Sequence, residues 1–282
     1  MPHCHRLLGR KVKFAFIGAY FGCTVRRMNP IKIESDGGFS LGGVKFVIQV
    51  AVPAKDRRPS TSKAFTIVKN EPYLRVYEDL ASGFSPRSIL ELGIFQGGSY
   101  IFLDKLFKPR RMSAVEINPK PVQPLLDYLS RTENRSVHFG TSQCDGDKLT
   151  QIVLGELADE LDLVVDDASH TYEETRASFE SLFPLLSPGG IYVIEDWSWA
   201  HHPDYQSPDA PFSRRRALSH LLFEQIMLMG STLLISEIRV WGFLYLIHKA
   251  KGAARSREIS QKVESDSIFD QILSRGKQWS LI

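Results

Sequence analysis

The sequence predicts an α/β fold built around a parallel sheet, and the prediction starts from residues 161–197. Two short apolar strands, Leu161–Val165 and Ile191–Ile194, flank a segment whose apolar residues recur at helical spacing, about 171–186. A Ser-Pro-Gly-Gly run at 187–190 is expected to end that helix and to turn the chain into the second strand. Strand, helix and strand in this order form a crossover between parallel strands.

Each of these two strands ends in a pair of acids, Asp166-Asp167 and Glu195-Asp196. The carboxyl ends of parallel strands share one sheet edge, where open α/β sheets bind ligands. Four carboxylates brought together must be protonated, paired with cations or bound to a metal, and hard oxygen ligands suit magnesium, calcium or manganese. The alternative interpretation is that they are solvated loop acids.

Composition sets the remaining limits. With 282 residues, 43% hydrophobic and 24% charged, the chain is long enough for one large globular domain with additions. Its net charge of +3 is too small to indicate nucleic-acid binding. Cys4, Cys23 and Cys144 are widely spaced without a CxxC motif, which favours a reducing compartment, and we predict a cytoplasmic protein.

The N-terminus, residues 1–30, is treated as an uncertain extension. A basic stretch at 1–13 precedes an apolar run at 14–25 that resembles the hydrophobic region of a signal peptide. That run is shorter than the roughly 20 residues that a membrane span requires, so no stable span is predicted. We favour an untidy extension or a start-site artefact, with translation beginning at Met28.

A small hairpin and linker are predicted for 31–70, ahead of the main domain at 71–250. Glycine pairs at 37–38 and 42–43 bracket a short strand, and an apolar strand follows at 44–52. The polar, proline-bearing segment 53–63 is typical of a linker or mobile loop. Apolar residues at helical spacing over 71–81 predict the helix that leads into the main sheet.

The first strand of that sheet, 88–92, runs into a glycine-rich turn before a helix at 100–107. Gly93, Gly97 and Gly98 permit a tight turn and close approach to a ligand, although a turn without a ligand is the alternative. The next strand, 112–115, ends in Glu116. Nucleoside-binding folds place at this position the carboxylate that accepts the ribose hydroxyls. A third strand, 137–139, leads into a polar loop that is either an adenine contact or an ordinary connection.

Four motifs together carry a family resemblance: ILELGIFQGGS, AVEINP, DLVVDDASH and PGGIYVIEDW. Over about 71–249 the chain resembles class I S-adenosylmethionine-dependent methyltransferases, and among them the macrocin and mycinamicin sugar O-methyltransferases and the cephalosporin hydroxylase group. The resemblance implies a Rossmann-like, doubly wound, mostly parallel seven-stranded sheet with an antiparallel last strand. The glycine motif is shared across the superfamily, whereas DDxSH followed by EDW is more restrictive.

The resemblance also implies roles for individual residues. Those that would bind S-adenosylmethionine are Glu91, Gly93 and Gly97 at the methionine part, Glu116 at the ribose, and Ser142 or Gln143 with Asp145 at the adenine. Similarity to catechol-type O-methyltransferases implies that Asp167, Glu195 and Asp196 hold Mg²⁺ or another divalent cation, with Asp166 structural.

Catalysis is then expected to rest on Asp167 and His170. A divalent ion lowers the pKa of an acceptor hydroxyl and orients it. His170 is suited to accept the proton near neutral pH, although a structural or helix-capping role is its alternative. Sugar-methylating relatives often carry a histidine pair before the last strand, where this chain has Arg239-Val240-Trp241-Gly242, so the mechanism either differs or relies on His170.

Segments after Asp196 suggest where the acceptor binds. Aromatic residues and histidines at 197–205 predict an acceptor-binding lid, with Trp197 or Trp199 stacking on a sugar, although a core position is the plainer interpretation. Arg214–Arg216 are interpreted as a solvated helix start, the helix running to about 229. Strands are expected at 233–240 and 242–247, and the tail at 251–282 is given no role.

The function predicted is divalent-metal-assisted transfer of a methyl group from S-adenosylmethionine to a hydroxyl of a saccharide or glycosylated metabolite. The expected partner is a small-molecule acceptor, with a homodimer left open. Two alternatives remain: an iron-dependent oxygenase of the cephalosporin hydroxylase type, and a non-catalytic binding protein on the same fold.

Overall fold

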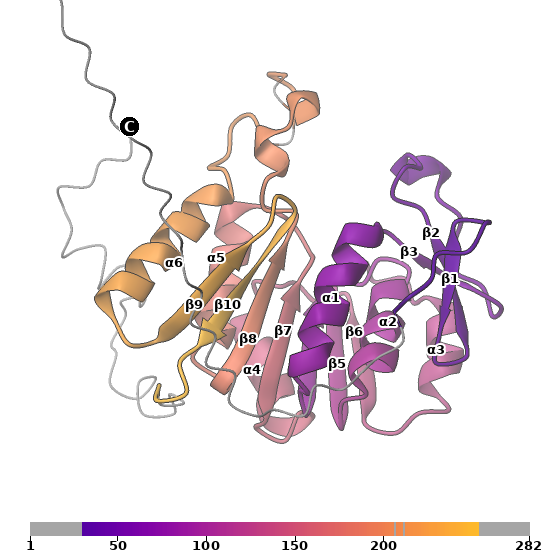
Figure 1. The fold of residues 1–282 in the computed structure, drawn as a ribbon, viewed down its shortest axis with the longest axis horizontal. Helices are drawn as coiled ribbons and strands as arrows, with labels where there is room; N and C mark the ends of the chain where they lie inside the picture. Colours follow the sequence, from indigo (N-terminus) through magenta and orange to yellow (C-terminus); the bar gives the residue numbers. More distant parts are fainter. Residues whose placement is uncertain (1–29, 206, 211, 254–282) are drawn as a thin grey trace, which may run out of the picture.

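The computed structural model describes residues 30–205, 207–210 and 212–253, so the expectations for the apolar run at 14–25 and for most of the tail lie outside the described residues. Its centre is a seven-stranded sheet in the order β6-β5-β4-β7-β8-β10-β9 (Figure 1). β10 pairs antiparallel with both β8 and β9, and the other neighbouring strands are parallel. The predicted fold class is therefore confirmed. The strands are β4 (Ser88–Leu92), β5 (Arg111–Glu116), β6 (Arg135–Phe139), β7 (Leu161–Asp166), β8 (Leu186–Glu195), β9 (Ile235–Val240) and β10 (Leu244–Lys249).

Helices cover both faces of this sheet. One hydrophobic cluster joins α1, α2 and α3 to one face, and a second joins α4, α5 and α6 to the other. None of the helices in the described part of the chain has the length and apolar character that a membrane span needs. The helices are α1 (Glu71–Gly83), α2 (Gly98–Phe107), α3 (Gln123–Leu129), α4 (Gly146–Gly155), α5 (Tyr172–Leu182) and α6 (Ser219–Ser231), with short 3₁₀ turns η1 (Ala54–Asp56), η2 (Trp199–His201) and η3 (Pro203–Tyr205).

The crossover between β7 and β8 differs from the prediction at its proline and glycines. α5 ends at Leu182, and β8 begins at Leu186. Leu161 pairs with Leu186 but Leu163 pairs with Ile191, so residues 187–190 bulge out of the ladder. The Ser-Pro-Gly-Gly run is thus a bulge within the strand, a position that tolerates a proline because no ladder donor is needed there.

The segment before α1 forms a second sheet that packs on α2 of the main domain. The predicted hairpin is present as β1 (Gly38–Leu41) and β2 (Val44–Ile48), and the second strand is shorter than expected. An unpredicted strand, β3 (Phe65–Ile67), pairs parallel with β2. Phe39 and Phe46 both make edge-to-face contacts with Phe102 of α2. These rings belong to the same hydrophobic core as one face of the main sheet. The hairpin and linker segment, residues 31–70, is therefore packed against the main domain, residues 71–250.

The segment expected to be a linker is anchored to the glycine-rich turn. The hydroxyl of Ser60 donates to the carbonyl oxygen of Gln96 at 2.7 Å and accepts from the N–H of Thr66 at 3.0 Å. A Cβ built on Gly98 would lie 2.0 Å from the carbonyl oxygen of Thr66, so β3 passes directly over the first turn of α2. This contact requires a glycine, and it brings the residues after β3 to the ligand-binding edge.

Gly98→Ala is expected to lower the free energy of unfolding by about 2 kcal/mol, because the new methyl group must displace the backbone of β3. Gly83→Ala is the matched control, since nothing lies within 4 Å of a Cβ built at the end of α1. That change should be neutral or stabilise by less than about 1 kcal/mol. Urea denaturation of both variants measures the difference, and equal effects would contradict the packing of β3 on α2.

Candidate functional site

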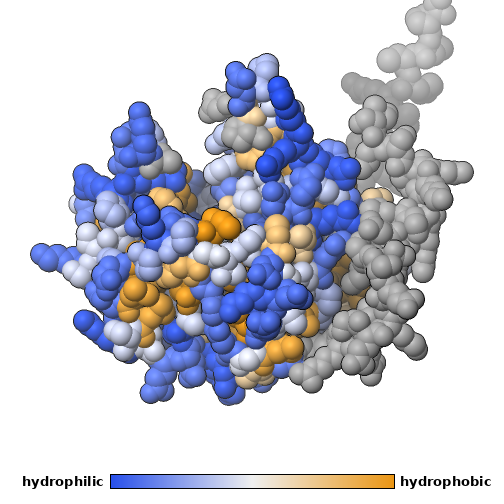
Figure 2. Space-filling model, turned by 180° about the vertical axis from the view of Figure 1, so that it is seen from behind, coloured by the Kyte–Doolittle hydropathy of each residue, from blue (hydrophilic) through white to orange (hydrophobic). Residues whose placement is uncertain are grey.

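A cavity of about 560 Å³ lies at the carboxyl ends of the parallel strands. Its lining comes from the glycine-rich turn after β4, the ends of β5 and β7, the loop after β6, the segment after β8 and the residues around β3. Figure 2 shows this part of the surface hollowed between two raised parts of the molecule. The edge at which the sequence predicted a ligand site is therefore the edge that carries the cavity.

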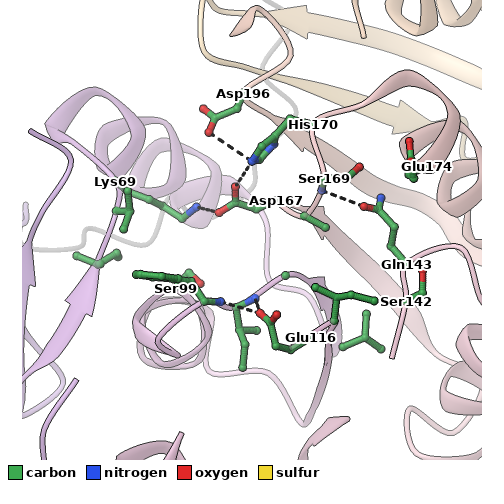
Figure 3. A pocket seen from close by; sticks show the side chains of 18 of the residues that line it. Lys69, Ser99, Glu116, Ser142, Gln143, Asp167, Ser169, His170, Glu174 and Asp196 are labelled. Atoms are coloured by element: carbon green, nitrogen blue, oxygen red, sulfur yellow. Dashed lines mark hydrogen bonds and ion pairs between the residues drawn. The ribbon is translucent and has the colours of Figure 1, made fainter. Parts of the chain in front are cut away.

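Glu116, at the end of β5, is hydrogen-bonded to the backbone of the glycine-rich turn. Its carboxylate accepts hydrogen bonds from the N–H groups of Ile94 at 3.1 Å and Phe95 at 2.9 Å, and from that of Asn118 at 2.9 Å (Figure 3). The side chain is 8% exposed and lines the cavity. A carboxylate fixed in this way is rigid before any ligand arrives.

Gly93 lets the end of β7 reach the same turn. Its φ is 80°, and a Cβ built on it would lie 2.5 Å from the carbonyl oxygen of Asp167 and 2.8 Å from the Cα of Ala168. Any side chain would push these two segments apart. The glycine therefore determines how close Asp167 can come to the turn.

Lys69 is the site residue that sequence reasoning missed. It follows β3, is 1% exposed, and its ammonium group donates to Asp167 Oδ2 at 2.8 Å and to Glu195 Oε2 (Figure 3). Burial disfavours the charge, but Asp167 and Glu195 outweigh it, and the pKa of Lys69 is raised. The sequence offers one signal for it. Lys69 directly follows Phe65–Val68, a run typical of a buried strand, and a lysine there has no solvated helix face on which to lie.

Glu195, the third expected metal ligand, lies on the Lys69 side of the site and is 2% exposed. Lys69 takes one carboxylate oxygen, and the hydroxyl of Tyr77 donates to the other, Oε1. Both oxygens are thus engaged by groups from β3–α1. Glu195 is not part of the group of candidate metal ligands found among the described residues.

That group consists of Asp167, His170 and Asp196, whose ligand atoms lie within 4.8 Å of one another. His170 Nε2 is 3.9 Å from Asp167 Oδ1 and 3.8 Å from Asp196 Oδ2 (Figure 3). The second oxygen of Asp196 accepts from the Tyr73 hydroxyl. Each aspartate therefore directs one oxygen toward the histidine and uses the other in a hydrogen bond to a group from β3–α1.

His170 is held in a strained conformation beside an aromatic ring. Its φ is 57°, in the left-handed region, and its imidazole lies 4.5 Å from the ring of Trp199, centroid to centroid. Such backbone conformations in non-glycine residues persist where surrounding contacts impose them, often at functional sites. Figure 3 shows the imidazole facing both aspartates, on the other side of Asp167 from Lys69.

Asp166, expected to be structural, is 2% exposed and hydrogen-bonded on the far side of the strand end. Its carboxylate accepts from Gln143, Ser178 and Tyr192, and burial raises its pKa to about 6. Gln143 also accepts from the N–H of Ser169 at 2.9 Å, which ties the loop after β6 to the loop that carries His170.

Three predicted cofactor contacts, Glu91, Gly97 and Asp145, stand apart from the cavity lining. Glu91 is fully buried within β4, and burial raises its pKa to about 8. Asp145 is exposed and caps α4 by accepting from the N–H of Lys148 at 3.0 Å. Ser142 lines the cavity, as does Gly93, whereas Gly97 is the left-handed residue before α2, with a φ of 78°.

Of the two tryptophans considered for stacking, Trp199 lines the cavity. Trp197 instead donates its indole N–H to the carbonyl oxygen of Trp241 at 2.8 Å, which fixes it to the β9–β10 hairpin. The residues expected at a helix start, 214–216, precede α6, and Arg215 pairs with Glu174 at 3.1 Å.

Residues 90–197 match a family of methyltransferase domains. Demethylmacrocin O-methyltransferase of Streptomyces fradiae is 48% identical over 50 residues, 18% of this chain and 13% of that protein. The 8-demethyl-8-alpha-L-rhamnosyl tetracenomycin-C 2'-O-methyltransferase of Streptomyces olivaceus is 30% identical over 146 residues, 48% of this chain and 35% of that protein. Mycinamicin VI 2''-O-methyltransferase of Micromonospora griseorubida is 50% identical over 44 residues, 16% of this chain and 11% of that protein.

The matches span about a third or less of the length of these relatives. Among solved structures, a methyltransferase of the mycinamycin biosynthetic pathway in complex with Mg and SAH has a TM-score of 0.46 at 24% identity, over 66% of this chain and 51% of that one. The O-methyltransferase TomG of tomaymycin synthesis from Streptomyces achromogenes has a TM-score of 0.44 at 18% sequence identity. That match covers 64% of this chain and 81% of the other. The resemblance to methyltransferases is confirmed by the family match over residues 90–197.

Gln143→Leu is expected to lower the free energy of unfolding by about 2 kcal/mol, because Asp166 and the N–H of Ser169 lose a buried partner. Ser142→Ala is the control, since its hydroxyl accepts from the backbone N–H of the exposed Cys144, and it should cost less than about 0.5 kcal/mol. Urea denaturation measures both. Similar losses would contradict the bridging role of Gln143.

Proposed function

We propose that this chain, whose residues 90–197 match a methyltransferase domain, is an S-adenosylmethionine-dependent O-methyltransferase acting on a sugar hydroxyl of a glycosylated metabolite. The observation that carries the proposal is that one cavity contains both Glu116 at the glycine-rich turn and the group formed by Asp167, His170 and Asp196. The first is a nucleoside-binding arrangement, and the second suits deprotonation of a hydroxyl.

Cofactor binding is assigned to the edge of the cavity at β4 and β5. The rigid carboxylate of Glu116 would accept hydrogen bonds from the two ribose hydroxyls. The methionine part would lie against the turn at Gly93. Ile117 lines the cavity with 67% of its surface exposed and offers an apolar face to the adenine, with Ser142 at its rim. S-adenosylmethionine, when bound, supplies the methyl group on a positively charged sulfur.

Asp167 and Asp196 would hold a divalent cation. Two carboxylate oxygens directed to one point fit Mg²⁺, which commonly takes one or two protein carboxylates and keeps other positions for water or substrate oxygens. The ion would lower the pKa of a coordinated hydroxyl and orient it. Glu195, the third carboxylate of the expected set, lies beside them and accepts from Lys69 and Tyr77.

His170 is assigned as the general base. Its Nε2 takes the proton of the acceptor hydroxyl while the oxygen forms a bond to the methyl carbon and the carbon–sulfur bond breaks. The carboxylates of Asp167 and Asp196 lie 3.9 and 3.8 Å from Nε2, so the base stands beside the position assigned to the cation. Trp199 limits the freedom of the ring and excludes water from one side of it.

The acceptor class rests on the names of the relatives, which are O-methyltransferases of demethylmacrocin, mycinamicin VI and 8-demethyl-8-alpha-L-rhamnosyl tetracenomycin-C. Trp199 lines the cavity, with its ring against His170 and stacked with that of Tyr205, and adds aromatic surface of the kind that sugar-binding sites use. The iron oxygenase alternative predicts that purified protein carries iron, and the non-catalytic alternative predicts that it binds no methyl donor. A homodimer and a cytoplasmic location stay predictions.

Glu116→Gln is expected to weaken S-adenosylmethionine binding about 10- to 100-fold, because one of the two charged acceptors for the ribose is lost. Glu133→Gln, an exposed carboxylate before β6, is the matched control and should leave the Kd unchanged. Equilibrium dialysis with labelled cofactor measures both. A Kd unaffected in Glu116→Gln would contradict the ribose assignment.

His170→Gln is expected to reduce kcat for methyl transfer about 10²- to 10⁴-fold, the range for loss of a general base. The Kd for the cofactor and the affinity for Mn²⁺ should stay within about threefold, because the substitution removes a base and no assigned ligand. The assay follows labelled methyl transfer to a panel of rhamnosides and aminosugar glycosides. A large loss of Mn²⁺ affinity would instead identify His170 as a metal ligand.

A further inference from the structure

The outer side of α6 is an apolar surface without charged residues. α6 lies beside β9 at one end of the sheet (Figure 1). Among its 13 residues, Glu224 is the only acidic or basic side chain other than histidine, and it is 7% exposed. Phe223 and Ile226, three residues apart, are 50% and 41% exposed, and Leu233, just after the helix, is 89% exposed. Together with the partly exposed Met227, they form what we call the α6 face.

The neighbouring helices on the same side of the sheet are built differently. α4 and α5 pack into the same hydrophobic cluster as α6. They carry acids and bases on their solvent sides, Asp147 and Lys148 on α4 and Glu173 and Glu180 on α5. A surface helix of a globular protein normally has charged and polar residues opposite its apolar stripe. The α6 face therefore has the composition of a surface that another element covers.

The chain leaves the described residues next to this face. The N–H of Ala250, just after β10, donates to the carbonyl oxygen of Leu234 at 2.8 Å, and Ala253 is 6% exposed. Leu234 directly follows the exposed Leu233. Residues 254–282 therefore start beside the C-terminal end of α6.

The sequence of that segment, which lies outside the described residues, predicts one short amphipathic helix at 268–275. Ser267 and Asp270 have the spacing of a capping box, and Gly276 occupies the position after a helix at which glycine is favoured. Apolar residues recur at the spacing of one helical stripe, at Ile268, Phe269, Ile272 and Leu273. A helix of this length is not stable alone in water, so it needs an apolar surface on which to pack.

The connection is long enough to reach the whole face. α6, with 13 residues, is roughly 20 Å long. Residues 254–267 extend to roughly 45 Å at most. A tethered segment meets a surface of its own chain at an effective concentration on the order of millimolar, well above that of a second copy in dilute solution. The tail is thus favoured over a second copy as the occupant.

We propose that residues 268–275 form a helix that docks its apolar stripe on the α6 face of the same chain. The inference is independent of the proposed function, since it uses no residue of the cavity. α6 nevertheless supports the candidate site, because the hydroxyl of Tyr172, two residues after His170, donates to Glu224 at 2.6 Å. The docked helix would therefore cover the element that holds the loop carrying His170.

Hydrogen–deuterium exchange of the full chain, followed by mass spectrometry, tests the docking. The amides of 268–275 are expected to exchange at least about tenfold slower than those of an unstructured chain of the same sequence. Ile226→Asp should abolish that protection, because it places a charge within the α6 face. Leu154→Asp on α4 is the matched control, since both side chains are 41% exposed, and it should leave the protection unchanged.

Phe269→Asp tests the contact from the tail and changes no described residue. It is expected to abolish the protection of 268–275 and to speed exchange of the α6 amides, whereas Gln271→Asp, on the polar side of the predicted helix, should do neither. Unprotected exchange of 268–275 in the wild type would overturn the proposal, as would equal protection in Ile226→Asp and Leu154→Asp. Protection that disappears on dilution would also overturn it, since a second copy would then supply the surface.

Discussion

The electrostatic repulsion among four acids at the ends of β7 and β8 is the constraint on which this site depends. Each acid is compensated in a different way. Asp166 is buried in a neutral hydrogen-bond network, and Glu195 is paired with Lys69. Asp167 and Asp196 each have one carboxylate oxygen in a hydrogen bond, and the other oxygen faces His170. Four residues of similar chemistry thereby acquire different functions from their surroundings alone.

The compensating groups come from parts of the chain far from the acids in sequence. Lys69, Tyr73 and Tyr77 belong to β3–α1, and they reach the site because a glycine in α2 allows β3 to lie on the glycine-rich turn. The same turn is closed by Glu116 and opened to Asp167 by Gly93. The groups proposed for the cofactor and for the metal therefore both contact one loop, which would suit a reaction whose main requirement is the relative position of two reactants.

Much of this arrangement was predictable from the sequence because it follows from local patterns. The strands, the glycine-rich turn, Glu116 and the acid pairs are read from short motifs, and parallel topology brings their ends together. Lys69 was not predictable, since its partners lie 98 and 126 residues away along the chain. Tyr73 and Tyr77 were recognised as an apolar helix face, but nothing local shows that their hydroxyls reach Asp196 and Glu195. The bulge at 187–190 was missed because proline and glycine more often end an element than interrupt one.

The central claim is that one preformed cavity binds S-adenosylmethionine at Glu116 independently of the cation at Asp167 and Asp196. Calorimetric titration of the purified chain with S-adenosylmethionine, with and without Mg²⁺, tests it most directly. Binding at a single site is expected in both conditions, with affinities that differ little, because separate carboxylates are assigned to the ribose and to the metal. Absence of binding in both conditions would contradict the account.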